Sequence, residues 1–324
     1  MTAPSSSLSR QVIELACRAP SVHNTQPWLW RIVGDDVIEL YADRRRQLPV
    51  ADPDGRNLAL SCGAAVHHST VAARALGLTP HVTLVPGDSD ADLLARIALS
   101  PGHVTDGASE ALAKLEARVT DRRRFTSWPV PEARVAHLAQ AASGWGAYAV
   151  PISDVTARYR TELLLSRALV AQRADERYVE EQDSWTGHGT HDGVPPENAA
   201  PGPTNRPGAR PHRYVAETEA APVPDLLEST DSVIAICTAG DDQLEWLRAG
   251  EALSAMWLRA TRDGLSLVPL SQVIEVAETR AALHQEVFAG MARPQILVRV
   301  GWQEISRTPL APSPRRPLED VLLP

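Results

Sequence analysis

The stretches NLALSCGAAVHHSTVAARALGLTP (residues 57–80) and EWLRAGEALSAMWLRATRDGLSLVP (residues 245–269) decide how the fold is interpreted. Each is rich in alanine, has the apolar spacing of a long helix, and reaches a glycine before a segment that contains a proline. One offset of 187 residues (250 − 63) relates the pairs Gly63/Gly250, Gly77/Gly264, Leu78/Leu265, Ala65/Ala252 and Ala73/Ala260. Alanine-rich helices that end in Gly-Leu are common, so chance similarity is the alternative to an internal duplication. A duplication would mean that the chain carries its own pseudo-dimer.

Helical and strand patterns alternate through the rest of the chain. Apolar periodicity predicts helices at 8–18, 56–76, 108–119, from about 131, 157–181 and 244–262. Alternating or short apolar runs predict strands at 29–32, 37–41, 81–85, 95–99, 232–237 and 295–300. Residues 183–215 are instead rich in glycine, proline and asparagine, a composition typical of a lid, a binding loop or disorder.

The overall composition argues against several functions. The chain has 324 residues and 44% hydrophobic content, enough for a sizeable core, but its net charge of −8 does not suit a nucleic-acid binder. Lys114 is the single lysine, so 31 of the 32 basic residues are arginine, the better side chain for bidentate phosphate contacts. No G-x-G-x-x-G, Walker or nucleophile-elbow motif occurs, so Rossmann, P-loop and serine-hydrolase functions have no support.

The cysteines and the termini bear on location. Cys17, Cys62 and Cys237 are far apart and lie in apolar contexts, which predicts buried thiols rather than a metal cluster or a disulfide framework. The first ten residues, MTAPSSSLSR, lack the apolar core of a signal peptide, and no apolar run has the length of a membrane span. We therefore expect a cytoplasmic protein that contacts neither membrane nor nucleic acid.

The loop APSVHNTQPW (residues 19–28) is the first candidate binding segment. Two prolines stiffen it, and Ser21, Asn24 and Gln26 supply short hydrogen-bonding side chains between them. Such a set could recognise the carbonyl and amide edges of a flat heteroaromatic ring. The alternative is a helix stop with ordinary Asx and Ser turns.

Two basic segments are candidate phosphate sites. RVTDRRRF (residues 118–125) places several guanidinium groups beside a hydroxyl, and RRPLED (residues 315–320) could bring two more to the same anion. The alternatives are a solvated basic turn and a surface tail. The equally basic run Arg44-Arg45-Arg46 has no other support, which shows how little such a run means by itself.

Together, these three segments resemble the nitroreductase family of FMN-dependent oxidoreductases. The loop at 19–28 is similar to that family's Pro-Ser-x-x-Asn-x-Gln-Pro-Trp motif, and the resemblance covers most of residues 8–320. Arg118, Thr120 and Arg122 match its Arg-x-Ser-x-Arg phosphate stretch, and Asp121 and the additional arginines depart from the family pattern. The tail matches its Arg-Arg-Pro-Leu-Glu clamp.

The order of these motifs resembles the Acg-type branch of actinobacterial nitroreductase-like proteins. Ordinary members carry the phosphate stretch and then the Pro-Ser loop in every subunit, so each dimer has two flavin sites. Here the Pro-Ser loop occurs only in the first half, and GWGAYAV occupies the corresponding region of the second half, near residues 145–150. The resemblance implies an α+β nitroreductase-like fold in two fused copies, 1–105 and 106–324, with a lid insertion at about 183–215 and a single FMN.

The resemblance also assigns roles to individual residues. The phosphate or ribityl chain would be contacted by Arg118, Thr120, Arg122, Arg315 and Arg316. The ring and its edge would be faced by Pro20, Ser21 and Asn24, with Gln26 supporting the loop, and by Pro269, Leu270 and Ser271 near the reactive nitrogen. The lysine that many nitroreductases place near the flavin is absent, because Lys114 is the only lysine.

The function implied is NAD(P)H-dependent reduction of nitroaromatic or quinone-like acceptors by a monomer that acts as a pseudo-dimer. No acid–base residue of the protein is required, because the cofactor carries the redox chemistry. The alternative is a protein that binds or sequesters FMN under a lid that blocks turnover. A third hypothesis is a structural pseudo-dimer that has lost its flavin.

Two groups of histidines are other candidate ligand-binding sites. His188, His191 and Asp192 in the GHGTHDG loop are a weak metal signal, because a glycine-rich loop rarely holds a metal with so few ligands. His67 and His68 are adjacent on a predicted helix, so they are expected to point away from any common ligand.

Overall fold

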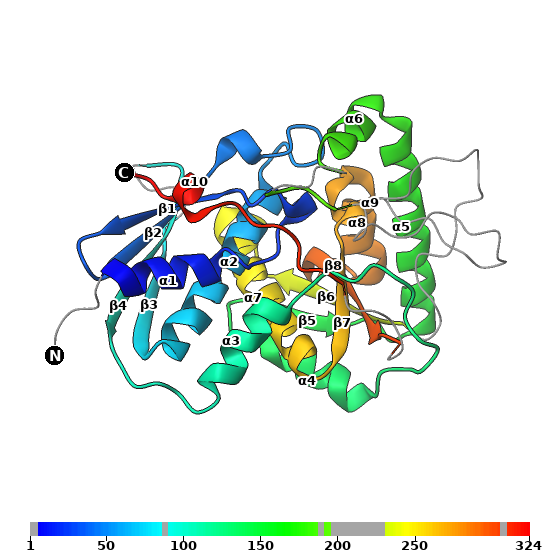
Figure 1. Ribbon diagram of the computed structural model, residues 1–324. Helices are drawn as coiled ribbons and strands as arrows, with labels where there is room; N and C mark the ends of the chain where they lie inside the picture. Colours follow the sequence, from blue (N-terminus) through cyan, green and yellow to red (C-terminus); the bar gives the residue numbers. More distant parts are fainter. Residues whose placement is uncertain (1–5, 86–89, 187–190, 196–230, 305–309) are drawn as a thin grey trace.

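Two four-stranded antiparallel sheets organise the chain in the computed structural model (Figure 1), which describes residues 6–85, 90–186, 191–195, 231–304 and 310–324. The first sheet has the order β1-β2-β4-β3, from β1 (Trp28–Val33), β2 (Val37–Ala42), β3 (Leu78–Leu84) and β4 (Leu93–Pro101). The second has the order β5-β6-β8-β7, from β5 (Tyr148–Pro151), β6 (Ser232–Thr238), β7 (Leu265–Leu270) and β8 (Arg293–Trp302). Both sheets therefore have one and the same topology.

The helices repeat the same scheme. A helix precedes the first strand of each sheet, α1 (Ser6–Ala16) and α4 (Glu132–Ala142), and a long helix joins its second and third strands, α2 (Arg56–Ala75) and α7 (Gln243–Arg262). The remaining helical elements are η1 (Val22–Asn24), η2 (Arg44–Arg46), α3 (Ala108–Ala117), α5 (Val155–Ala174), α6 (Glu176–Ser184), α8 (Gln272–Glu275), α9 (Ala277–Ala282), the π-helical turn η4 (Leu283–Val287) and α10 (Leu318–Val321).

Helices α2 and α7 pack against each other between the two sheets (Figure 1). A Cβ atom on Gly63 would overlap the carbonyl oxygen of Leu247, and a Cβ atom on Gly250 would overlap the carbonyl oxygen of Leu60. Leu60 and Leu247 are separated by the same 187 residues (247 − 60) as the two glycines. Such reciprocal contacts are the signature of a twofold interface, so the helix pair packs as two subunits of a symmetric dimer would.

Polar side chains at this interface correct one expectation from the sequence. His67 and His68 do not point to different partners, because Nδ1 of His67 lies 2.7 Å and Nδ1 of His68 lies 2.8 Å from Oγ of Ser254. The close approach of the two helices brings one hydroxyl within reach of both rings. Both rings are buried, and burial lowers the pKa of His67 to about 3. The pair is therefore neutral at ordinary pH and belongs to the helix interface.

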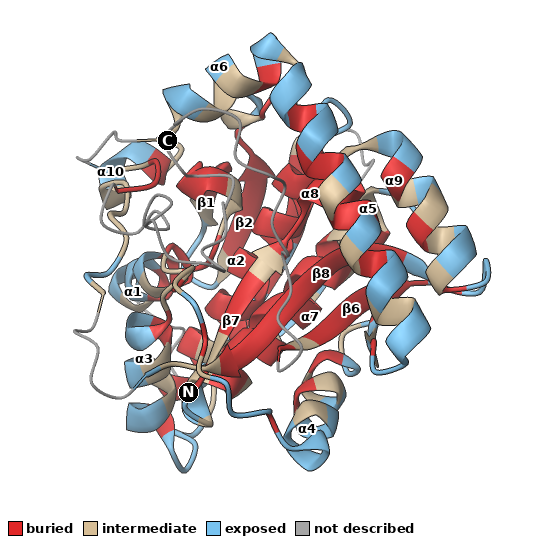
Figure 2. Cartoon of the chain, turned by 90° about the vertical axis from the view of Figure 1, so that its right-hand side faces the viewer, coloured by how far each residue is buried: buried red, intermediate tan, exposed pale blue. Residues whose placement is uncertain are grey.

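The second sheet is covered on both faces, whereas the first sheet has one polar face. Along β6, Ile234 and Ile236 enter the core with α4 and α7, while Val233 and Ala235 enter a different core with α5 and α8. A strand buried on both sides reads as a continuous apolar run, which is how SVIAIC appears in the sequence. Figure 2 shows β6, β7 and β8 buried beneath α5, whose outer surface is exposed.

Of the covering helices, α5 lies in the connection between β5 and β6, where the first sheet has only a tight turn at Gly34, and α8 lies between β7 and β8. The single helix predicted at 157–181 is wrong: the chain breaks at Asp175, which has φ −96° and ψ 106°. The Asp175 side chain accepts a hydrogen bond from the backbone N–H of Arg177, and it thereby caps a new helix. Asp175 is thus the N-cap of a second helix, within a sequence whose helical periodicity continues on both sides of it.

The end of the chain returns to the first sheet. Leu322 forms a parallel bridge with Trp30, and the N–H of Leu323 donates to the carbonyl oxygen of Trp30 at 2.7 Å. Residues beyond 310 therefore pack on the half that was assigned to residues 1–105. The boundary at 105/106 and the origin of the two halves by duplication both stay predictions.

The three cysteines are buried and form no disulfide. Burial raises the pKa of the Cys17 thiol and of the Cys237 thiol to about 12, and it raises that of Cys62 as well. These thiols are therefore protonated and unreactive at neutral pH. Among the described residues, no helix has the length and apolar character needed to cross a membrane.

A buried carboxyl on α7 leads to a prediction about pH. Burial raises the pKa of Glu251 from 4.5 to about 8. The folded protein therefore holds a proton that the unfolded chain releases, so stability from this group is complete below pH 4.5 and is lost as pH rises to 8. We expect the free energy of unfolding of Glu251→Gln, relative to that of the parent, to increase by about 1–3 kcal/mol from pH 5 to pH 8. Urea unfolding at each pH measures this difference.

The exposed carboxylate of Glu278 on α9 provides the control for this measurement. Glu278→Gln removes one exposed carboxylate from the surface, and the gain of Glu251→Gln between the two pH values should exceed any change that this control produces. A flat difference between Glu251→Gln and the parent would show that Glu251 is ionised inside the folded protein.

Candidate functional site

A cavity of about 850 Å³, counted with its open mouth, lies between α2, α7 and the loop that enters β1. The residues that line it are Pro20, Ser21, Val22, His23, Asn24, Asn57, Leu60, Ser61, Arg118, Thr120, Arg122, Gly193, Val194, Leu253, Trp257, Pro269, Ser271, Ile296, Ser313 and Arg315. Both halves of the chain therefore contribute to one site.

The loop at residues 20–28 has an unusual backbone. His23, Asn24 and Gln26 have positive φ angles of 46°, 56° and 50°, a region that non-glycine residues enter only at a cost of about 1 kcal/mol or more each. Ser21 holds the turn, because its Oγ accepts a hydrogen bond from the backbone N–H of Gln26 at 2.9 Å. Strained backbone of this kind persists where the surroundings hold it, which is typical of binding loops.

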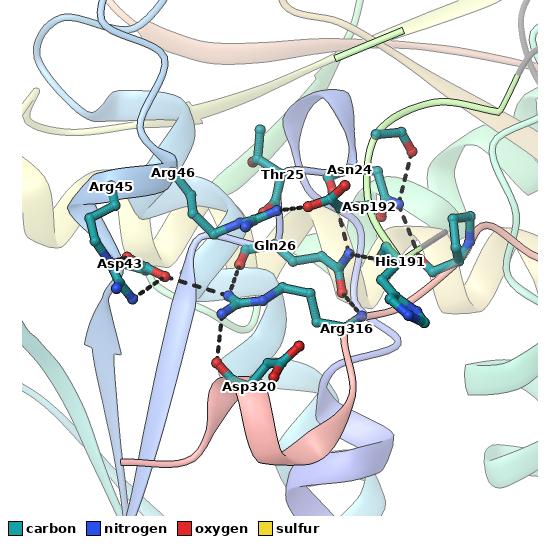
Figure 3. A network of polar contacts seen from close by, with 12 residues as sticks. Asn24, Thr25, Gln26, Asp43, Arg45, Arg46, His191, Asp192, Arg316 and Asp320 are labelled. Carbon is teal, nitrogen blue, oxygen red and sulfur yellow. Dashed lines mark hydrogen bonds and ion pairs between the residues drawn. The ribbon is translucent and has the colours of Figure 1, made fainter. Parts of the chain in front are cut away.

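The amides of Asn24 and Gln26 hold the loop to two distant segments (Figure 3). Asn24 Nδ2 donates to the carbonyl oxygens of Gly193 and Pro314, at 3.0 and 3.1 Å, and its Oδ1 accepts from Arg315 at 3.0 Å. Gln26 Nε2 donates to the carbonyl oxygen of His191 at 2.8 Å, and its Oε1 accepts from the N–H of Arg316 at 2.9 Å. These amides are therefore occupied by the protein itself.

One end of the cavity carries buried positive charge. Arg118 is 5% exposed, stacks on Trp257 at 4.7 Å and donates from Nη2 to the carbonyl oxygen of Arg18, while its Nε and Nη1 have no partner among the described residues. Burial lowers the pKa of Arg118 to about 9 and that of Arg315 to about 10, and the charge of Arg315 contributes to the shift of Arg118. Neither guanidinium forms an ion pair with an acidic side chain among the described residues, so an anion placed between them would stabilise both.

Nine of the twelve residues predicted for the site line this cavity. They are Pro20, Ser21, Asn24, Arg118, Thr120, Arg122, Pro269, Ser271 and Arg315. Gln26, Leu270 and Arg316 do not line it. The binding roles of all twelve stay predictions, but the structure brings together residues that are up to 295 positions apart (315 − 20).

The position of Arg316 differs from the role expected for it. Its Nη1 donates to the carbonyl oxygens of Gln26 and Trp28, at 3.2 and 3.4 Å, and lies 3.5 Å from Oδ2 of Asp43, while Nη2 donates to the carbonyl oxygen of Asp320. Figure 3 shows these contacts between the loop, Asp43 and the tail. The guanidinium of Arg316 therefore fastens the tail to the loop, whereas that of Arg315 reaches the cavity.

The sequence analysis missed the walls formed by α2 and α7. Asn57, Leu60 and Ser61 on α2, and Leu253 and Trp257 on α7, line the cavity. Their spacing of three or four residues places each set on one helix face. These two helices are the ones that the repeat identified, so a comparison of their faces could have found the walls.

Residues 191–194 close part of the cavity next to the loop. Asp192 forms an ion pair with Arg46, and the Arg46 guanidinium also lies over the ring of Trp185 at 5.2 Å. Val194 forms a bridge with Thr186, and with Gly193 it lines the cavity. Most of the predicted lid at 183–215, including 187–190 and 196–215, lies outside the described residues.

The described residues do not support the weak metal hypothesis. No group of three or more His, Cys, Asp or Glu side chains among them could hold a metal ion. Asp192 is engaged by Arg46, and His188 lies outside the described part of the chain.

The chain is similar to several known proteins along nearly its whole length, although no family model matches it. It is 40% identical to a Mycobacterium tuberculosis protein assigned by name to the NAD(P)H nitroreductases, Rv3131, over 98% of this chain and 92% of that protein. It is 32% identical to a second such protein from the same organism, acg, over 96% and 94%. Among solved structures, the FMN-dependent nitroreductase NfnB from Mycobacterium smegmatis in complex with NADPH aligns at 16% identity over 63% of this chain and 95% of that chain, with a TM-score of 0.37.

Proposed function

The chain belongs to the nitroreductase family, and from this premise we propose that it is an FMN-dependent oxidoreductase. It would take a hydride from NAD(P)H and pass electrons to a nitroaromatic or quinone-like acceptor. The observation that carries the proposal is the guanidinium pair of Arg118 and Arg315 at one end of a cavity built from both halves, because each has a buried nitrogen without a hydrogen-bond partner among the described residues.

The residues of the cavity fit an FMN molecule. Arg118 and Arg315 would hold the phosphate, because a phosphate dianion would satisfy Nε and Nη1 of Arg118 and Nε of Arg315, which have no hydrogen-bond partner among the described residues. Arg122, which also lines the cavity, would add positive charge. Leu60 and Leu253 provide apolar surface for a flat ring. FMN, when bound, would supply the hydride and electron transfer.

The protein's own contribution would be binding, orientation and exclusion of water. The strained loop at residues 20–24 would be held against the ligand by its contacts to the tail and to residues 191–193. The site would need no general acid or base from the protein. The internal α2–α7 interface would let the chain act as a monomer, which light scattering of the purified protein would check.

An absorbance spectrum tests the proposal most directly. Purified protein supplied with FMN should show a bound flavin spectrum, and anaerobic NADPH or NADH should bleach it. A protein that stays colourless with added FMN would support the third hypothesis, in which the flavin site has been lost. A bound flavin that neither nicotinamide reduces would refute the oxidoreductase proposal.

The contacts of residues 191–194 favour a second candidate function, an FMN-binding protein with little turnover. Three side chains of the loop region, Asn24, Gln26 and Arg46, bind this segment, and two of its residues line the cavity. A segment held this firmly could keep NAD(P)H away from a bound flavin.

Weakening this closure provides a prediction that separates the two functions. Asp192→Asn removes the ion pair with Arg46, so we expect FMN release and NADPH oxidation to become several-fold faster, measured by stopped-flow fluorescence and steady-state kinetics. Glu180→Gln, which removes an exposed carboxylate from α6, should change neither rate. If Asp192→Asn speeds FMN release but turnover stays absent, the binding-protein function is favoured over the enzyme.

A further inference from the structure

The side-chain amide of Asn24, which the resemblance placed at the ring edge, is engaged by the protein. Both the Nδ2 and the Oδ1 atoms of Asn24 are used, by Gly193, Pro314 and Arg315. Gln26 is used in the same way and does not line the cavity. A flat ring with an amide-type edge therefore needs another polar partner on the cavity wall.

Asn57, in the first turn of α2, has the geometry for that role. Its Nδ2 donates to Oε1 of Glu275 at 3.2 Å. A carboxylate can only accept hydrogen bonds, so the nitrogen side of the amide must face Glu275 and the oxygen side must face away from it. Asn57 lines the cavity, and its Oδ1 has no hydrogen-bond partner among the described residues.

The carboxylate that orients Asn57 is itself held from several sides. Glu275 Oε2 accepts from Nε2 of Gln172 at 2.6 Å and lies 3.3 Å from the hydroxyl of Tyr178. These donors come from α5 and α6, and Glu275 ends α8, so four helices meet at one carboxylate. Fixing Glu275 in this way also fixes the direction of the Asn57 amide.

The backbone of Asn57 is positioned by a separate contact. The two carboxylate oxygens of Asp52 accept from the N–H groups of Asn57 and Leu58, both at 2.9 Å. These bonds hold the first turn of the helix. Asp52 in the first half therefore holds the backbone of Asn57, and Glu275 in the second half holds its side chain. The Oδ1 atom of Asn57 remains as a hydrogen-bond acceptor.

We propose that Asn57 Oδ1 accepts a hydrogen bond from a ring N–H of the ligand in the cavity, which makes Asn57 a specificity-determining residue for flat heteroaromatic rings with an amide-type edge. The proposal rests on the proposed function, since the pyrimidine edge of FMN carries such an N–H. A buried acceptor that meets a matching donor discriminates against analogues in which that donor is missing.

Two ligands and two variants test this role. Parent and Asn57→Leu proteins are titrated with FMN and with 3-methyl-FMN, which lacks the ring N–H, and flavin fluorescence quenching reports each Kd. We expect the parent to bind FMN about tenfold more tightly than 3-methyl-FMN, and Asn57→Leu to lose this preference, as one hydrogen bond of about 1.4 kcal/mol would produce. Gln285→Leu, which removes an exposed amide on η4, should keep the preference.

Other outcomes would overturn the proposal. If Asn57→Leu keeps the parent's preference for FMN, Oδ1 does not contact the ring N–H. If Asn57→Leu leaves flavin preference intact but raises the KM for NADPH, the amide reads the nicotinamide carboxamide instead. Asn57→Ser gives the same comparison should the leucine variant not fold. A parent protein that binds FMN without any preference refutes the role of Asn57 alone, whereas a parent that binds no flavin refutes the proposed function.

Discussion

Gly63→Ala is expected to destabilise the protein by about 3 kcal/mol or more, because the new methyl group has no space. Its Cβ would lie inside the carbonyl oxygen of Leu247, on the backbone of α7, and backbone cannot move aside as a side chain can. The helices would have to separate along the interface that joins the two sheets. Thermal unfolding should show a Tm lowered by roughly 10 °C.

The sign of the change in stability distinguishes close helix packing from helix propensity. In an isolated helix, alanine is more stable than glycine by about 1 kcal/mol, so helix propensity alone predicts stabilisation. Gly250→Ala should have the same effect as Gly63→Ala, because its Cβ would meet the carbonyl oxygen of Leu60 in the reciprocal contact. Equal losses at both positions would support the pseudo-twofold packing.

Gly144→Ala is the matched control. Gly144 is exposed, and a Cβ atom there would meet no atom within 4 Å. Its substitution should leave Tm unchanged or slightly raised. If Gly63→Ala behaves like Gly144→Ala, the helices do not approach as closely as described.

Arg118→Met is expected to weaken FMN binding by about 100-fold, because charge-assisted hydrogen bonds to the phosphate would be lost. The apo protein should become no less stable, and could become more stable, since a buried guanidinium with two unpartnered nitrogens is replaced by an apolar chain. Opposite changes in ligand affinity and apo stability are not expected of a residue with a purely structural role.

Comparison with riboflavin, which lacks the phosphate, isolates the role of the charge. The parent should prefer FMN strongly over riboflavin, and Arg118→Met should reduce that preference to a small factor. Isothermal titration with both ligands gives the two affinities. Equal losses of affinity for FMN and riboflavin would show that Arg118 acts through the fold and not through the phosphate.

Arg316→Met is the control that the structure itself supplies. Arg316 is adjacent to Arg315, yet its guanidinium contacts Gln26, Trp28 and Asp320 outside the cavity. We expect this variant to loosen the tail and the loop, and so to weaken both ligands together, while the preference for FMN over riboflavin remains. The resemblance assigned both arginines to the phosphate, so this comparison tests whether Arg316 shares that role with Arg315.

Local patterns were sufficient for much of the fold. The two long helices, the hairpin of β1 and β2 and the strand β6 have periodicities that depend only on which face of an element is buried. The break at Asp175 was missed because its capping bond competes with a pattern that continues through it. Strands β5 and β7 were not predicted as separate strands, because they are short and each contains a proline.

The candidate site divides in a similar way. Nine of the predicted residues line the cavity, because they belong to short motifs whose members stay close together when the chain folds. The roles of Asn24 and Arg316 could not be predicted, since each depends on contacts with segments about 290 residues away. Asn57 was missed for the same reason, because Glu275 orients it from the other half.

By itself, the sequence determined the long helices, most of the strands, the repeated glycine positions and the motifs that place the chain among nitroreductases, because these features depend on side chains close together in the chain. Only the tertiary structure decided that Gly63 and Gly250 are each other's contact, that Arg315 and not Arg316 reaches the cavity, and that residues 191–194 lie against the loop. Hydrogen-bonding capacity is limited, so an individual atom whose capacity is filled by its own protein is not free for a ligand. Which side chains remain free is known only when every segment of the chain has been packed.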